Sequence, residues 1–128
     1  MSVLSTANLY GWAKQAFQVG ASRFPKFEIS FLSAYNDCLF DLYNDALIDE
    51  PTLLTDMATD SELELRYLPQ LKVGLKFFMQ TSGEWIRGDD IDKYAQLNWN
   101  TAKGVISNAI VRAVEDAGTY TGPWGDTA

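Results

Sequence analysis

The sequence predicts an all-α fold, a compact bundle of about four helices with an extended C-terminal tail. Apolar residues recur at three- and four-residue spacing over four long segments, which is the period of an α-helix. No segment of any length alternates apolar and polar residues as a strand would. The 128 residues suffice for one domain with its own core. We therefore expect a helical bundle domain over 1–118 and a docking tail over 119–128.

The first helix is expected over residues 5–20. A Ser-Thr-Ala-Asn cluster that begins at Ser5 is suited to capping the start of the helix. A glycine at the end of the segment is typical of a helix terminus. The residues at helical spacing are Leu9, Trp12, Ala13, Ala16, Phe17 and Gly20.

The second helix is expected over residues 25–48, where Pro25 fits the first turn because its missing N–H costs nothing there. Two neighbouring apolar stripes make this helix apolar over a wide arc, so it must contact more than one neighbour. Cys38 lies on the first stripe and has no histidine partner, which predicts a packed core thiol. The two stripes are Phe27, Phe31, Ala34, Cys38, Leu42 and Ala46, and Leu32, Tyr35, Leu39, Tyr43 and Leu47.

The third helix follows a loop that we expect over residues 49–60. Ser61 and Glu64 have the spacing of a capping box, which predicts a helix start at Ser61. The helix should end near Ser82-Gly83. Because Pro69 removes one backbone donor, it should kink this helix or make it begin again near Leu68. The expected inner face is Leu65, Leu68, Leu71, Leu75 and Phe78.

The fourth helix is expected to begin after Gly88 and to continue to Gly118. Asp89, Asp90 and Asp92 would then occupy its first turn, where negative charge is favourable to the helix dipole. The glycine-rich tail that follows carries large apolar side chains, which favours docking on another surface over a free end. The apolar stripe of the helix is Ile91, Ala95, Trp99, Ala102, Ile106, Ala109 and Ala113.

Composition excludes several classes of protein. With 10 basic and 17 acidic residues the formal charge is −7, which argues against sequence-specific nucleic-acid binding. The absence of histidine removes Ser-His-Asp and Cys-His catalysis and histidine-ligated zinc. A single cysteine permits no intrachain disulfide. No apolar run is long enough for a membrane span and no signal pattern opens the chain, so we expect a cytosolic place of synthesis and no membrane association.

Negative charge is concentrated in the middle of the chain. Residues 27–65 contain ten acids and no base. Asp37, Asp41 and Asp45, called here the acidic line, are four residues apart and lie along one side of the second helix. Three interpretations stay open: a solvated face, pairing with Lys72 and Lys76 on the third helix or a neighbouring copy, or the wall of a channel that repels a polyanion.

The candidate chemistry favours no enzyme. Asp89, Asp90 and Asp92 form the only carboxylate cluster dense enough to suggest Mg²⁺ or Ca²⁺, and helix capping explains them without a metal. The glycines of the tail precede no helix and no lysine, so they do not form a phosphate loop. Trp12 and Trp99 lie on apolar stripes and are expected in the core. We predict no catalytic residue, no cofactor and no metal.

The order of these segments resembles a known family. A helix that starts F-x3-F-x2-A (27–34) and an acidic loop are followed by the pattern L-x2-L-P-x-L-x2-G-L (65–75), then by Gly-Glu-Trp (83–85), a last helix and an aromatic tail. This resembles the head-to-tail adaptor (connector) proteins of tailed bacteriophages. The resemblance implies a structural virion protein in the neck, assembled in the host cytoplasm. It would form a dodecameric ring that binds the portal and tail or nozzle proteins and leaves a channel for DNA.

On this interpretation the tail residues Tyr120, Pro123 and Trp124 would anchor on an adjacent subunit or on the portal, as aromatic anchors commonly do. The acidic line would present a negative lumen or would pair across subunits. The main alternative is a small cytosolic acidic helical inhibitor or regulatory binding protein, whose acidic middle is the binding face. A metal-dependent enzyme subunit that uses Asp89, Asp90 and Asp92 is the third class.

Overall fold

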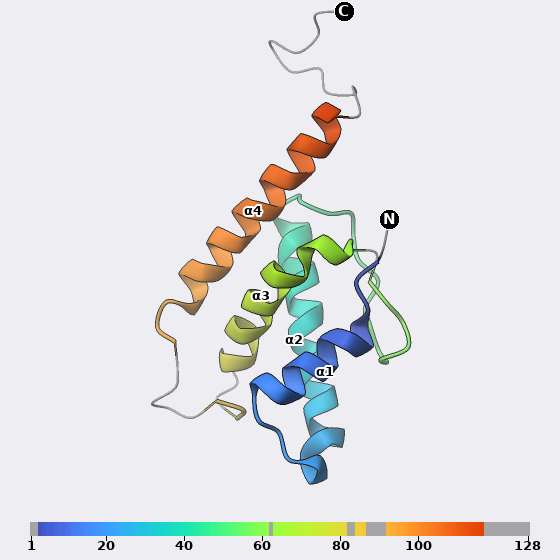
Figure 1. The fold of residues 1–128 in the computed structure, drawn as a ribbon, viewed down its shortest axis with the longest axis vertical. Helices are drawn as coiled ribbons and strands as arrows, with labels where there is room; N and C mark the ends of the chain where they lie inside the picture. Colours follow the sequence, from blue (N-terminus) through green and yellow to red (C-terminus); the bar gives the residue numbers. More distant parts are fainter. Residues whose placement is uncertain (1–2, 62, 82–83, 87–91, 117–128) are drawn as a thin grey trace, which may run out of the picture.

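The four expected helices are present, and the all-α bundle is confirmed (Figure 1). The structure is a computed structural model and describes residues 3–61, 63–81, 84–86 and 92–116. One-turn 3₁₀ helices at 21–23 and 65–67 lead directly into the second and third α-helices. The α-helices are α1 (Thr6–Ala16), α2 (Phe24–Asn44), α3 (Leu68–Thr81) and α4 (Ala95–Asp116).

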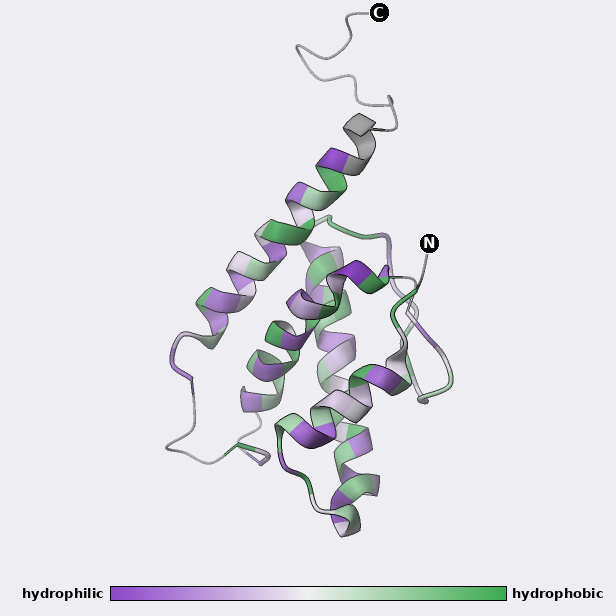
Figure 2. Cartoon of the chain, viewed as in Figure 1, coloured by the Kyte–Doolittle hydropathy of each residue, from purple (hydrophilic) through white to green (hydrophobic). Residues whose placement is uncertain are grey.

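Helix α3 lies between α2 and α4 and packs against both, while α1 contacts α2 and α3 (Figure 1). Each helix carries hydrophobic and hydrophilic bands in turn, as the period of its sequence requires (Figure 2). The C-terminal turns of α4 extend beyond the ends of α2 and α3. The bundle therefore leaves one side of α4 without a neighbouring helix among the described residues.

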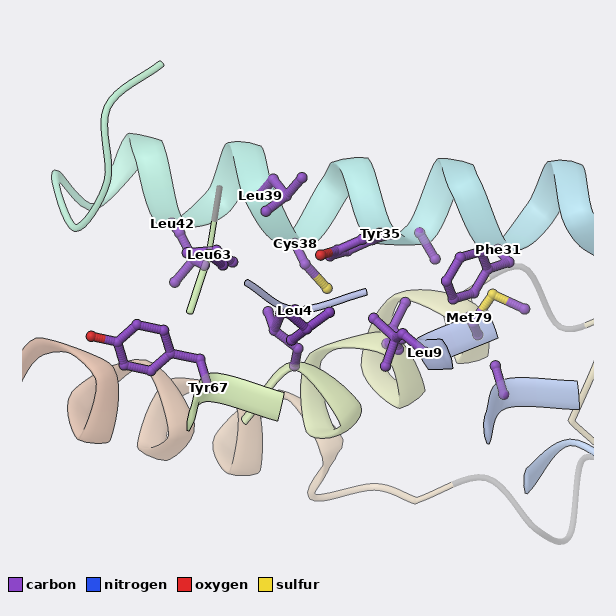
Figure 3. Close-up of a cluster of buried hydrophobic side chains, with 14 of the residues drawn as sticks. Leu4, Leu9, Phe31, Tyr35, Cys38, Leu39, Leu42, Leu63, Tyr67 and Met79 are labelled. Carbon is purple, nitrogen blue, oxygen red and sulfur yellow. The ribbon is translucent and has the colours of Figure 1, made fainter. Parts of the chain in front are cut away.

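A single core joins all four helices. The labelled side chains of Figure 3 show its centre, where residues of α2 meet Leu4, Leu9 and the start of the third helical segment. Cys38 is fully buried, which confirms the core thiol. Trp99 is buried as expected, and Trp12 is half-buried against the same core. The largest fully buried side chains are Trp99, Tyr35, Phe27, Phe31, Leu4, Leu9, Leu39, Leu42, Leu71, Leu75 and Ile106.

Helices approach one another closely at Gly74 of α3. A Cβ atom at this position would lie 2.7 Å from Cζ3 of Trp99 and 2.9 Å from Sγ of Cys38. Trp99 belongs to α4 and Cys38 to α2, so a residue without a side chain lets both neighbours meet α3 at one level. Gly74 thus sets the spacing of the three-helix layer.

The long connection between α2 and α3 is fixed to the bundle by side chains. The Asn36 amide donates to the Leu54 carbonyl oxygen and accepts from the Leu54 N–H, both at 2.9 Å. The hydroxyls of Tyr35 and Ser61 are 2.7 Å apart. Near the N-terminus, Thr6 binds the backbone and side chain of residues 59–60. These hydrogen bonds, with the buried side chains of Leu54 and Leu63, hold the described part of the connection against the bundle.

The predicted capping box at Ser61 and Glu64 is wrong. Ser61 uses its hydroxyl for Tyr35, and Glu64 has extended backbone and pairs with Arg66. The Leu4 N–H donates to the Leu63 carbonyl oxygen at 2.9 Å, which holds this segment extended against the N-terminal residues. The helical structure begins at 65–67, and α3 starts at Leu68, the restart that Pro69 predicted.

Two helices end earlier than expected, for the same reason. Helix α2 was expected to reach Ile48 and ends at Asn44, because Ala46 adopts a left-handed conformation with φ 61°. The Leu47 N–H then donates to the Leu42 carbonyl oxygen, as in a Schellman motif. Helix α1 ends at Ala16 rather than Gly20, with Gln18 at φ 53°. Its start is as predicted, since the Ser5 side chain accepts from the N–H of Asn8.

Helix α4 begins at Ala95, not directly after Gly88, and extends to Asp116. Asp92 precedes it and caps it, since its carboxylate accepts from the Tyr94 N–H and its carbonyl oxygen from the Ala95 N–H. Gln80 of α3 holds Asp92 by two further hydrogen bonds at 2.8 Å. The other expected first-turn acids (Asp89, Asp90) and the tail residues (Tyr120, Pro123, Trp124) lie outside the described residues.

Candidate functional site

The acidic line of α2 faces α4. Asp41 Oδ2 accepts a hydrogen bond from Trp99 Nε1 at 2.6 Å and another from Lys103 Nζ at 3.0 Å. The Lys103 ammonium also lies 2.7 Å from Asp45 Oδ2. One lysine of α4 thus joins two carboxylates of α2, and the Trp99 indole completes the cluster. The cluster bridges two helices that both pack on α3.

Lys103 is held in its charged form. Its side chain is only 14% exposed, and burial by itself lowers the pKa, but the hydrogen bonds to Asp45 and Asp41 outweigh it and raise the pKa above the ordinary lysine value. Lys72 and Lys76 were the in-chain partners expected for the acidic line, and neither pairs with it among the described residues. Lys72 lies over the Trp12 ring, and Lys76 is exposed. The partner that the described residues show is Lys103.

A groove runs beside this cluster, between α2 and α4. Its cavity has a volume of about 380 Å³. Two phenylalanines of α3 lie at its walls, and residues of α2 and α4 complete it. The lining residues are Asp37, Phe40, Asp41, Asn44, Phe77, Phe78, Gln96, Trp99, Asn100 and Lys103.

Asp37 is the member of the acidic line that has no hydrogen-bond or ion-pair partner among the described residues. Partial burial in the groove raises the pKa of its carboxyl above the ordinary aspartate value. Asp41 and Asp45 share one ammonium, so the groove and its cluster hold three carboxylates and one base. The site is therefore negatively charged and lined with aromatic rings.

The sequence missed most of this site. It singled out Asp37, Asp41 and Asp45, but it did not point to Lys103, Phe40 or the polar side chains of α4. The sequence did contain an indication of Lys103, because this lysine directly follows the buried Ala102 and so lies beside the apolar stripe of its helix. A lone lysine beside a core stripe indicates a carboxylate on a packed neighbour.

A second surface feature is the outer face of α4. Leu97 is 61% exposed, and Tyr94, Val105 and Val111 are also among the exposed large hydrophobic residues. Leu97, Gly104 and Val111 are seven residues apart and so lie on one side of the helix. No atom outside the local chain comes within 4 Å of the Cβ position of Gly104. The face, called here the outer face of α4, is accessible, and it mixes these apolar residues with the exposed polar residues Thr101 and Asn108.

The remaining features offer less chemistry. A second cavity of about 420 Å³ lies beside the connection between α2 and α3 and is lined by three acids (Asp49, Glu50, Asp60) together with hydroxyl-bearing and apolar residues. Burial raises the pKa of the Cys38 thiol well above its usual range, so the thiol is unreactive. In the described ranges, no three acidic or cysteine side chains converge as a metal site would require. Of the helices that the structure describes, none is both long and apolar enough to cross a membrane.

Comparison with known proteins gave no match: no protein-family model, curated protein or solved structure matches this chain.

Proposed function

We propose that the chain is a non-enzymatic structural protein, a head-to-tail adaptor of a tailed bacteriophage that forms a ring beneath the portal and continues the DNA channel. The observation that carries this proposal is the outer face of α4. The helix buries Trp99 and Ile106 on one side and exposes Leu97 and Val111 on another. Large apolar side chains exposed away from the core side of a helix support an assembly in which each subunit covers part of its neighbour.

The outer face of α4 is suited to a contact between the subunits of a ring. A closed ring needs a head-to-tail contact in which one surface meets a different surface of the next subunit. The outer face of α4 would supply one of these two surfaces, since it lies away from the side of the helix that buries Trp99 and Ile106. The element order and the L-x2-L-P-x-L-x2-G-L pattern at 65–75 support the family resemblance in the same direction.

The alternative, an acidic inhibitor or regulatory protein of the cytosol, would bind through its acidic middle. Two of the three carboxylates of the acidic line are engaged with Lys103 inside the chain. Less free negative charge is then available along this helix, both for a basic partner and for the wall of a DNA channel, so neither function rests on the acidic line as a whole.

Native mass spectrometry of the complex from its natural source tests the proposal. About a dozen copies bound to a larger ring-forming protein are expected from the family resemblance. One or two copies with a small basic partner would contradict the adaptor function and support the inhibitor.

A variant pair links the result to the outer face of α4. The double substitution Leu97→Ser and Val111→Ser should prevent incorporation into the complex. Ile29→Ser is the matched control, because Ile29 is 71% exposed but belongs to α2. Equal incorporation of both variants would exclude the outer face of α4 as the assembly surface.

A further inference from the structure

The groove between α2 and α4 combines one unpartnered carboxylate with a lining of aromatic rings and polar side chains. Asp37 lies at this groove without a partner among the described residues, and Phe40, Phe77 and Phe78 contribute rings to the lining. The Asp37 carboxylate is exposed at the groove and can pair with a cation, and aromatic faces attract cations as well. The ligand that complements this groove is therefore positively charged with an apolar body.

The acceptors at the groove distinguish between the two common cationic side chains. Beside Asp37, the amide side chains of Asn44, Gln96 and Asn100 line the same cavity and supply carbonyl oxygens. A guanidinium has five donors in one plane and stacks on aromatic rings, whereas an ammonium is a compact and strongly hydrated charge. Several acceptors around aromatic rings thus fit arginine better than lysine.

We propose that the groove between α2 and α4 is a docking site for an arginine side chain presented by a partner protein. The guanidinium pairs with the Asp37 carboxylate, and its stem lies against the phenylalanine rings. The apolar residues that flank such an arginine would contact the neighbouring outer face of α4, since Leu97 directly follows the groove residue Gln96. This binding site does not depend on whether the protein is a phage adaptor.

The test is a titration of the ¹⁵N-labelled full chain with the peptide acetyl-Leu-Arg-Leu-amide. The indole N–H signal of Trp99 is a local reporter, because this group lines the groove and donates to Asp41 at 2.6 Å. We expect a saturable shift of that signal. The same peptide with citrulline in place of arginine, which keeps the shape and removes the charge, should bind about tenfold more weakly or not at all. Equal binding of the two peptides would overturn the proposal.

Matched variants distinguish specific binding in the groove from non-specific electrostatic attraction of the peptide to an acidic protein. Asp37→Asn should weaken binding of the arginine peptide about tenfold. Glu28→Gln removes the same charge from the same helix at a residue outside the groove lining and should leave binding unchanged. An equal loss in both variants would show non-specific attraction and refute the site.

Two further outcomes would also refute it. Equal binding of a lysine peptide would exclude guanidinium recognition. A change of the Trp99 signal with protein concentration, in the absence of peptide and abolished by Asp37→Asn, would assign the groove to a second copy of this chain.

Discussion

The substitution Gly74→Ala should destabilise the protein, although alanine is the better helix former. The added Cβ would lie 2.7 and 2.8 Å from two ring carbons of Trp99 and 2.9 Å from Sγ of Cys38. Optimal contacts between non-bonded carbon atoms are about 3.5–4.0 Å. The added methyl group would therefore overlap both neighbours by roughly an ångström.

The side chains around Gly74 determine how much the Gly74→Ala substitution lowers the free energy of unfolding. Trp99 is 1% exposed and Cys38 is fully buried, so neither side chain can turn away into solvent. Overpacking of this kind costs about 1–3 kcal/mol, whereas replacing glycine in a helix gains about 1 kcal/mol. We expect the overlap to dominate, with the free energy of unfolding falling by about 1 kcal/mol, the difference between a cost of about 2 and a gain of about 1 kcal/mol.

Urea unfolding followed by circular dichroism measures this change as a lower midpoint at an unchanged slope. Gly104→Ala and Gly11→Ala are matched controls, because both glycines are helical and no atom outside the local chain lies within 4 Å of their Cβ positions. Each control should stabilise the protein by about 0.5–1 kcal/mol. A stabilising Gly74→Ala would refute the close contact of the three helices.

A double-mutant cycle identifies the contact. Cys38→Ala removes the sulfur atom that the new methyl group meets, so the double variant should lose less stability than the sum of the two single variants. We expect a coupling of at least about 0.5 kcal/mol. Strict additivity would show that the cost of Gly74→Ala does not arise at Cys38.

Four other changes have expected outcomes. Asn36→Ala leaves both backbone groups of Leu54 without their partner and should cost about 2–4 kcal/mol in urea unfolding, with Asn44→Ala as an exposed control. Ala46→Gly should stabilise by about 1 kcal/mol, because glycine adopts the left-handed conformation of this position without strain, and a loss of stability would contradict the Schellman motif. Burial raises the pKa of Tyr35 from 10.0 to about 12, so the folded state retains a proton that the unfolded state releases. Stability should therefore fall between about pH 10 and pH 12, and Tyr35→Phe should make this decline less steep. Lys103→Met leaves two facing carboxylates uncompensated and should lower the free energy of unfolding by about 1–3 kcal/mol, a loss that Lys76→Met should not reproduce.

The sequence alone determined the class of the fold, because the period of its apolar residues depends only on local geometry. The stripes of the second and fourth helices place Cys38, Trp99 and Ile106 in the core, where the structure has them. Pro69 likewise indicated the start of α3, since its ring and missing N–H act on the nearest turn.

Helix ends and the 45–64 connection were decided by tertiary contacts. Ala46 and Gln18 take the left-handed conformation that normally indicates glycine, so no residue type marked these ends. Ser61 could cap a helix or bind Tyr35, and only the packed neighbour favoured the second.

The candidate site also required the tertiary structure. The sequence placed Asp37, Asp41 and Asp45 on one side of a helix, but their roles depend on which residue of another helix lies opposite. Lys103 is 58 residues from Asp45 in the chain and neutralises part of the acidic line only because α2 and α4 both pack on α3. Sequence periodicity specifies which face of a helix is apolar, whereas the relative rotation and spacing of packed helices specify which polar groups meet.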